Sequence, residues 1–239
     1  MDVIELTATQ PRHADLARKP LLGLTILAVE DSRYASEALR LMAVRSGARL
    51  RRADSLKSAY RHLATYRPSV VIVDIGLPDG PGLDLIADLA QMRPNAPGIL
   101  ATSGDSGGEV ARAARAAGAD AFLEKPIAGL RAFQAAILRL FPDREAGRDR
   151  SVLTFAPDIR PDALALREDL GHVLDLVGPV EDPSEREVEA YAIQFLTSVA
   201  GAAGDADLAG LAAGLAAGGG TRAAARTALV RRLEKMPAL

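Results

Sequence analysis

The sequence predicts an α/β fold with a doubly wound parallel sheet, followed by an all-α helical domain. Two observations lead to this prediction. Between Leu21 and Phe141, five short apolar runs alternate with longer segments whose apolar residues have helical spacing. From Asp162 onward only the helical period remains. Short runs rich in Val, Ile and Leu fit strands that are covered on both faces, and strands that alternate with helices form parallel sheets.

The five apolar runs are "LTILAV", "ARLRRA", "SVVIVD", "APGILATS" and "ADAFLEK". With right-handed crossovers, we expect them to form a flavodoxin-like (βα)5 sheet with the strand order 2-1-3-4-5. The basic residues of "RLRR", at 49–52, fit an exposed edge strand, where charges guard against aggregation. Gly118 in "AGAD" fits the left-handed position that ends a helix.

The chain divides into four parts. We expect an N-terminal tail at residues 1–20, the sheet domain at 21–142, a linker at 143–160 and the helical domain at 161–239. The linker region is rich in charge and has little periodicity, although "SVLTF" within it also fits a short strand. About 120 residues suffice for the sheet domain.

Four short helices are expected in the last part of the chain. The second begins at "DPSE", with Asp182 as the cap, Pro183 in the first turn and Glu185 reaching back. Asp205 and Thr221 are the expected caps of the third and fourth. Four such helices suit a compact bundle or a dimer-forming pair of hairpins. The expected apolar positions are Ala163, Leu166, Leu170, Val173, Leu174, Val177, Val188, Tyr191, Phe195, Val199, Leu208, Leu211, Leu215, Leu229, Val230 and Leu233.

The composition excludes several classes of function. The chain has 239 residues and a net charge of -2, which gives no bulk attraction to nucleic acid or to an anionic membrane. It has no cysteine, so disulfides, thiolate metal sites and cysteine nucleophiles are excluded. The first twenty residues lack the apolar core of a signal peptide, and no run is long enough to span a membrane. We therefore expect a cytoplasmic protein.

Polar residues follow four of the five predicted strands. Glu30 and Asp31 come after the first strand, Asp74 ends the third, Ser103 ends the fourth and Lys125 follows the fifth. In open parallel sheets, sites form at the carboxyl ends of the strands. We therefore expect three acids, a hydroxyl and a lysine to meet at one edge of the sheet.

This set of groups fits phosphoryl chemistry. Three neighbouring carboxylates repel one another, and a hard divalent cation with oxygen ligands relieves the repulsion. Mg²⁺ suits a site with few carboxylates and retained waters. Phosphoryl transfer needs neutralisation of charge on the phosphoryl oxygens, which the metal, Lys125 and a hydroxyl would supply. Asp74 would be the nucleophile, because a carboxylate can form an acyl phosphate.

Residues 21–142 resemble the receiver domain of bacterial two-component response regulators. The resemblance implies that Asp74 is the phosphoacceptor of a signalling protein, and that its donor is a histidine kinase or a histidine phosphotransfer protein. It also implies Mg²⁺ held by Glu30, Asp31, Asp74 and the backbone carbonyl of Gly76. Glu30 departs from the aspartate that is more usual in this family, yet its longer side chain can reach the metal directly or through water. The matching marks are Glu30-Asp31, "DIGLP" with Asp74 and Pro78, Gly82, Ser103 before Gly104, and Lys125-Pro126.

The same resemblance implies a switch. Ser103 and Lys125 would bind the phosphoryl oxygens, and the bond between Lys125 and Pro126 would be cis. Phe122 matches the family's switch aromatic, which turns inward when Ser103 moves toward the phosphoryl group. Thr102 also carries a hydroxyl; the count back from Lys125 favours Ser103, but the choice between the two stays open.

Simpler readings exist for each of these residues. Asp31 or Ser32 also fits a helix cap, Lys125 a solvated surface residue, and Ser103 an ordinary turn serine. Phe122 also fits a plain core position. The agreement of five marks in order and spacing favours the functional reading.

The second half of the chain is expected to act through protein contacts. Residues 151–239 contain eight Lys or Arg and thirteen Asp or Glu, a net charge of about -5 that repels a phosphate backbone. They show no evident helix-turn-helix. We therefore expect a helical domain that does not bind DNA and that forms a homodimer or docks to a protein partner. Whether phosphorylation would expose or hide this domain stays open.

Two alternatives remain. The first is a phosphorelay intermediate that passes phosphate onward through His172, although the lysine-glycine that usually follows such histidines is absent and "HVLDLVG" stands there. The second is a flavodoxin-like cofactor binder. It is disfavoured because a flavin phosphate needs a loop rich in Ser or Thr after the first strand, where this chain has acids.

Overall fold

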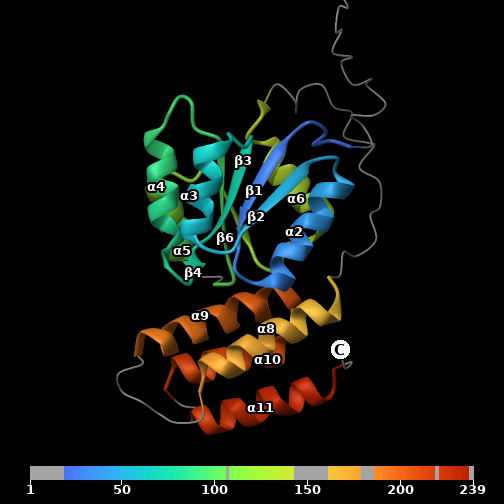
Figure 1. Cartoon of the computed structure of the whole chain (residues 1–239), viewed down its shortest axis with the longest axis vertical. Coiled ribbons are helices and arrows are strands. Elements are labelled where there is room, and N and C mark those ends of the chain that lie inside the picture. The colour runs from blue at the N-terminus through green and yellow to red at the C-terminus, as the bar shows by residue number, and fades with distance from the viewer. Residues whose placement is uncertain (1–18, 106–107, 143–160, 179–185, 219–220, 237–239) are drawn as a thin grey trace, which may run out of the picture.

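The computed structural model describes residues 19–105, 108–142, 161–178, 186–218 and 221–236. These residues form an α/β domain and a bundle of helices that lies against one edge of the sheet (Figure 1). The tail before residue 19, the linker at 143–160 with "SVLTF", and the predicted cap at Asp182–Glu185 lie outside the described residues. The helices of the described ranges include none that is long and apolar enough to cross a membrane.

The sheet of the α/β domain has five parallel strands in the order β2-β1-β3-β6-β7, which confirms the predicted order. The basic strand β2 lies at the edge, as expected. After β3, a two-stranded antiparallel pair that the sequence did not predict is formed by β4 (Gly76–Leu77) and β5 (Gly80–Pro81). The sheet strands are β1 (Thr25–Val29), β2 (Arg49–Ala53), β3 (Val70–Asp74), β6 (Gly98–Ser103) and β7 (Ala121–Glu124).

Helices cover both faces of the sheet (Figure 1). Helices α2 (Arg33–Arg45) and α6 (Gly129–Leu138) cover one face. Helices α3 (Leu56–Thr65), α4 (Gly82–Gln91) and α5 (Gly108–Ala117) cover the other. Because side chains alternate along a strand, each central strand feeds both apolar layers.

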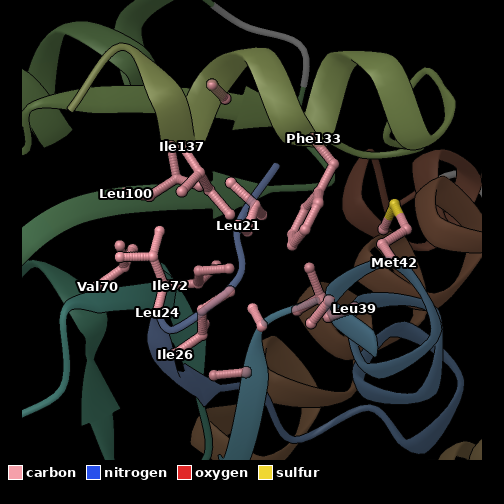
Figure 2. Packing of buried hydrophobic residues seen from close by; sticks show 14 of the residues in the cluster. Leu21, Leu24, Ile26, Leu39, Met42, Val70, Ile72, Leu100, Phe133 and Ile137 are labelled. Carbon is pink, nitrogen blue, oxygen red and sulfur yellow. The ribbon is translucent and has the colours of Figure 1, made fainter. Parts of the chain in front are cut away.

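The layer beneath α2 and α6 illustrates this alternation. Ile26 of β1 and Ile72 of β3 meet Leu39 and Phe133 there (Figure 2). Their neighbours in the strands, Leu27 and Val71 among them, pack on the opposite face. The two layers bury the central strands on both faces, so the loops at the carboxyl edge extend from a closely packed sheet.

The bundle consists of α8 (Ala163–Leu176), α9 (Arg186–Ala203), α10 (Ala206–Ala216) and α11 (Arg222–Glu234). Asp205 caps α10 and Thr221 caps α11, as predicted, because each side chain accepts hydrogen bonds from backbone N–H groups of the first turn. The side chains buried at the centre include Leu170, Val173, Phe195, Leu196, Val199, Leu208 and Leu229.

Three positions that were expected on the apolar faces are exposed: Ala163, Val188 and Val230. Val188 is 40% exposed and Val230 is 38% exposed. Val230 follows the buried Leu229 directly, and a step of one residue turns a helix by about 100°, which takes its side chain off the buried face.

Candidate functional site

The acids predicted to meet at the sheet edge lie together. Glu30 and Asp31 follow β1, and Asp74 is the last residue of β3. Each of the three offers a carboxylate oxygen, and these oxygens all lie within 4.8 Å of one another. Adjacent parallel strands end at the same edge, which explains why residues so far apart in the sequence converge.

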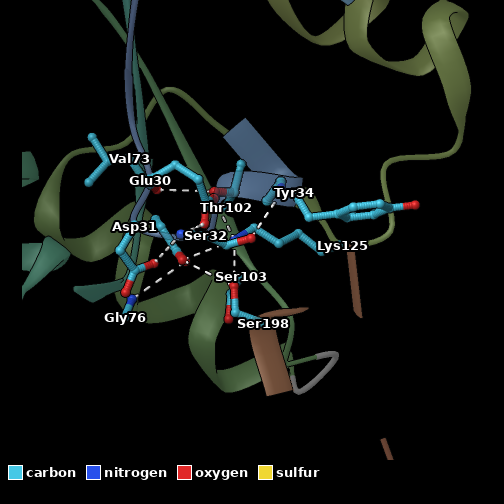
Figure 3. A network of polar contacts seen from close by, with 12 residues as sticks. Glu30, Asp31, Ser32, Tyr34, Val73, Gly76, Thr102, Ser103, Lys125 and Ser198 are labelled. Atoms are coloured by element: carbon cyan, nitrogen blue, oxygen red, sulfur yellow. Dashed lines mark hydrogen bonds and ion pairs between the residues drawn. The ribbon is translucent and has the colours of Figure 1, made fainter. Parts of the chain in front are cut away.

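Lys125 reaches into this cluster from the loop after β7 (Figure 3). Its Nζ lies 2.6 Å from Oε2 of Glu30 and 2.9 Å from Oδ2 of Asp74, and all three side chains are buried. The peptide bond between Lys125 and Pro126 is cis, as the resemblance implied, and Arg93–Pro94 is a second cis bond that was not expected. The buried position is incompatible with a solvated surface role for Lys125.

Burial and mutual repulsion control the charges of the cluster. Burial raises the pKa of Glu30 well above its usual value, although Lys125 opposes this, while Asp74 and Asp31 add repulsion. Burial also raises the pKa of Asp31 to about 7, again with repulsion from Asp74. For Lys125, burial disfavours the charged form, but Asp74 and Glu30 outweigh it and raise the pKa. The site thus has too much negative charge for its single ammonium group.

The donor set fits a divalent cation. Three carboxylates face one ammonium group, which leaves two negative charges in excess when all are ionised. Among the described residues, Oε2 of Glu30 is buried and has no hydrogen-bond partner besides its ion pair with Lys125. Oxygen ligands on a partly buried acidic cluster are the coordination that Mg²⁺ and similar hard cations prefer. The acidic pocket could therefore hold such an ion.

Gly76 and Gly82 shape the loop that follows Asp74. The N–H of Gly76 points to Oδ1 of Asp74 at 3.5 Å. A Cβ added at Gly82 would overlap the carbonyl oxygen of Asp74, so only glycine allows α4 to begin so close to the site.

The two candidate hydroxyls differ in their surroundings. Thr102 is buried and its Oγ1 lies 3.4 Å from the carbonyl oxygen of Val73, within the sheet. Ser103 is half-buried, accepts a hydrogen bond from the N–H of Asp105, and lines a cavity of about 220 Å³ together with Asp74. Ser103 is therefore the hydroxyl that lines the same cavity as Asp74.

Phe122 lies in β7 opposite Ala101 of β6 and is half-buried. Its ring packs against the apolar layer beneath α3, α4 and α5. A half-buried aromatic at the sheet edge is compatible with both the switch role and the plain core role.

Helix α9 supplies site residues that the sequence did not reveal. Ser198 donates a hydrogen bond to Oδ2 of Asp74 at 3.2 Å and accepts one from Nζ of Lys125 at 2.7 Å (Figure 3). Tyr191 donates from its hydroxyl to Oδ2 of Asp31 at 2.8 Å. Burial and the charge of Asp31 raise the pKa of Tyr191. Gln194 packs against Gly76, where a Cβ would overlap its side chain.

A signal for these residues exists in the sequence. Tyr191, Gln194, Ser198 and Gly201 recur at spacings of three and four, so they form a stripe of polar and small residues along one side of α9. Such a stripe beside the apolar positions of α9 indicates a polar surface beneath it, but it does not indicate which surface.

Asp169 of α8 contacts the beginning of α2. Its carboxylate accepts hydrogen bonds from the hydroxyl of Ser32 at 2.7 Å and from the N–H groups of Arg33 and Tyr34 at 2.9 Å each. Ser32 itself caps α2, accepting from the N–H of Ala35. An acid at a helix N-terminus meets unpaired N–H groups and the positive end of the helix dipole, so this contact fixes the bundle to the sheet domain.

His172, the candidate of the relay hypothesis, also lies in α8. Its ring is exposed and makes an edge contact with the ring of Phe195 at 5.2 Å between centroids. Asp169 and Glu168 are residues of α8 that bond to the beginning of α2 near the acids, whereas this ring contact of His172 lies within the bundle.

Comparisons with known proteins match this chain to one family. Residues 26–137 match the family model of the response regulator receiver domain. The chain is 32% identical over 170 residues to the KDP operon transcriptional regulatory protein KdpE of Escherichia coli, which covers 71% of this chain and 68% of KdpE. It is 32% identical over 138 residues to the response regulator MprA of Mycolicibacterium vanbaalenii, which covers 56% of this chain and 59% of MprA.

A solved receiver domain protein from Methanospirillum hungatei covers 52% of this chain and 98% of its own length, with 22% identity and a TM-score of 0.47. The family match ends before the bundle, so α8–α11 lie outside it.

Proposed function

Since the chain belongs to the response regulator family, with a receiver domain at residues 26–137, we propose that phosphoryl transfer to Asp74 switches it. The observation that carries this proposal is the buried cluster in which Lys125 bridges Glu30 and Asp74, with Asp31 alongside. The chain would act as a phosphoacceptor and not on a separate substrate.

In the proposed reaction, a carboxylate oxygen of Asp74 attacks the phosphorus of a phosphohistidine on a histidine kinase or phosphotransfer protein. The P–N bond breaks, the electron pair returns to the imidazole, and the acyl phosphate forms. Lys125, already 2.9 Å from Asp74, would stay beside the transferred group and offset its charge.

Glu30, Asp31, Asp74 and the backbone carbonyl of Gly76 would hold Mg²⁺, which neutralises phosphoryl oxygens when it is bound. Ser103 would be the hydroxyl that contacts the phosphoryl group, because it shares a cavity with Asp74. Thr102 instead lines a separate cavity beside Glu30, and its hydroxyl lies 3.4 Å from the carbonyl oxygen of Val73. Phe122 would follow the movement of Ser103.

For the output, we propose protein contacts or dimerisation through the helical bundle. The bundle carries a net negative charge, and three arginines of α11 bind groups within it. Arg222 pairs with Glu189, Arg232 pairs with Asp205, and Arg226 donates to the carbonyl oxygen of Leu174. Arginines that bind groups within the bundle are less available to contact phosphates of nucleic acid.

A DNA-binding output is the second candidate, because KdpE is named as a transcriptional regulatory protein. A gel-shift assay at low salt with mixed genomic fragments separates the two. Specific retardation that depends on phosphorylation would replace the protein-contact output with DNA binding, whereas its absence is what we expect.

The proposal is tested by intact mass measurement after incubation with phosphoramidate and Mg²⁺. We expect one phosphoryl group on the wild type, and none on Asp74→Asn or in excess EDTA. Asp84→Asn, an exposed acid in the first turn of α4, is the matched control and should be modified like the wild type. Base-stable, acid-labile label on His172 in Asp74→Asn would instead support the relay alternative.

A further inference from the structure

Helix α9 occupies the space from which a donor must approach Asp74. Asp74 is 2% exposed, and its Oδ2, a candidate attacking oxygen, is hydrogen-bonded to Ser198 and Lys125. In-line attack requires the phosphorus to lie next to this oxygen, with the leaving imidazole on the far side of the phosphorus. The hydroxyl of Ser198 lies there now.

The backbones of α9 and of the loops after β6 and β7 are in close contact. The space that remains beside Asp74 is the cavity of about 220 Å³ that Gln194 and Ser198 also line, and a protein surface bearing a donor histidine cannot enter it while α9 is in place. A Cβ added at Gly104 would lie 2.7 Å from the carbonyl oxygen of Thr197. A Cβ added at Gly201 would lie 3.2 Å from the Cα of Gly104 and 3.3 Å from the carbonyl oxygen of Lys125. The glycines on both surfaces allow α9 to reach the loops after β6 and β7 directly.

Polar contacts fix the bundle in this position. Asp169 accepts three hydrogen bonds at the beginning of α2, and Tyr191 binds Asp31. At the outer rim, Arg33 pairs with Glu168 at 2.9 Å. Each contact joins the bundle to a residue of the receiver domain that is at the site or next to it.

We propose that the α8–α9 face and the histidine-bearing donor compete for the same surface of the receiver domain. This surface consists of the N-terminal turn of α2 and the loops after β1, β3, β6 and β7. While the bundle is docked, Asp74 is closed to phosphoryl transfer, and the donor gains access only when α8 and α9 leave together. The inference rests on the proposed function, because it concerns access to the same acceptor carboxylate.

A reversible cross-link tests the competition in the full chain. Because the chain has no cysteine, Arg33→Cys with Glu168→Cys places the only two thiols across the rim of the interface. A bismaleimide with an internal disulfide joins them, and a reductant cuts the link. We expect phosphorylation by phosphoramidate and Mg²⁺ to be at least about tenfold slower in the joined chain than after cutting.

A matched pair controls for the chemistry. Glu37→Cys with Arg40→Cys replaces an ion pair of the same kind within α2 alone. Joining these two positions leaves the bundle free to move, so the rate should not change. Equal rates before and after cutting in the Arg33–Glu168 pair would overturn the proposal.

A second variant opens the interface instead of closing it. Asp169→Asn removes the charge that binds the N–H groups of α2, and we expect phosphorylation to be about tenfold faster. Asp175→Asn, an exposed acid on the same helix, should leave the rate unchanged. Absence of phosphorylation in every variant, including Asp169→Asn, would contradict the proposed function itself, whereas phosphorylation at one rate throughout contradicts only the competition.

Discussion

The receiver domain and the helical bundle build their interiors differently. The receiver has two apolar layers on a central sheet, with large side chains such as Ile72, Leu85 and Phe133 fully buried. The bundle has one layer shared by four helices, and α10 consists of Ala, Gly and Leu apart from one Asp. A few large side chains therefore supply most of the apolar packing of the bundle. We expect the bundle to have a lower free energy of unfolding than the receiver domain.

Glycines show the same difference. In the receiver, Gly82 is required because any side chain would meet the backbone of Asp74. In α10, a Cβ at Gly210 or Gly214 would meet no heavy atom within 4 Å. The receiver uses glycine for close packing at its site, whereas α10 carries glycines that only weaken it as a helix.

The largest effect should come from emptying the centre of the bundle. Leu196 is fully buried in α9, and Leu196→Ala should lower the free energy of unfolding by about 3 kcal/mol because it leaves a cavity. Urea unfolding should then show the bundle melting before the receiver. Val188→Ala, on the same helix but 40% exposed, is the control. If both variants lowered the free energy of unfolding equally, the stability of the bundle would not depend on its large buried side chains.

A smaller loss of stability is expected from a substitution at a closely packed glycine of the receiver domain. Gly82→Ala pushes a methyl group against the carbonyl oxygen of Asp74 and should cost about 2 kcal/mol. Gly108→Ala, in the first turn of α5 with open space around it, should be neutral or slightly stabilising. The thermal unfolding transition of the receiver domain measures the stability of both variants. A neutral Gly82→Ala would contradict the close approach at the site.

The contact between the two domains should affect metal binding. Tyr191 donates to an oxygen of Asp31 that a cation would share. Tyr191→Phe should therefore tighten Mg²⁺ binding about fivefold, the equivalent of one hydrogen bond of about 1 kcal/mol. Calorimetric titration measures this, and Tyr60→Phe, which loses a hydroxyl bonded to Asp88 far from the acids, should bind like the wild type. Weaker binding in Tyr191→Phe would show that the hydroxyl supports the metal site.

The smallest effect should be an increase in the stability of the bundle. Gly214→Ala in α10 should stabilise the bundle by about 0.5–1 kcal/mol, because alanine restricts the unfolded chain and fits the open space. Gly218→Ala, just after the helix, should do the opposite, since Gly218 has φ of +64°, which disfavours a side chain. Equal signs for the two would contradict the assignment of Gly214 as a weak helical position.

The fold of the receiver domain could be predicted from the sequence because each strand is marked by a short local pattern of residues. Runs such as "VVIVD" show where the buried strands lie, and parallel topology then brings Asp31, Asp74 and Lys125 to one edge. Roles in phosphoryl transfer remain predictions for these residues. The short pair β4–β5 escaped prediction because two-residue strands leave no periodic pattern.

The docking of the bundle could not be predicted in the same way. Ser198 and Asp74 are 124 positions apart, and their contact depends on how the two folded domains pack against each other. Tyr191 was expected to be apolar, and its ring does lie near Phe195, with 5.9 Å between centroids. Its hydroxyl nevertheless points to Asp31, because one side chain can serve an apolar layer and a polar site together.

The central claim is that a phosphoryl group on Asp74 and a docked α9 exclude each other. The most direct measurement is amide hydrogen exchange at Arg33 and Tyr34, whose N–H groups are held by Asp169, with beryllofluoride and Mg²⁺ as the phosphoryl mimic. Fluorine NMR reports separately that the mimic is bound. The account predicts faster exchange at both amides in the wild type and no change in Asp74→Asn. Unchanged exchange in wild-type chain that has bound the mimic would contradict it.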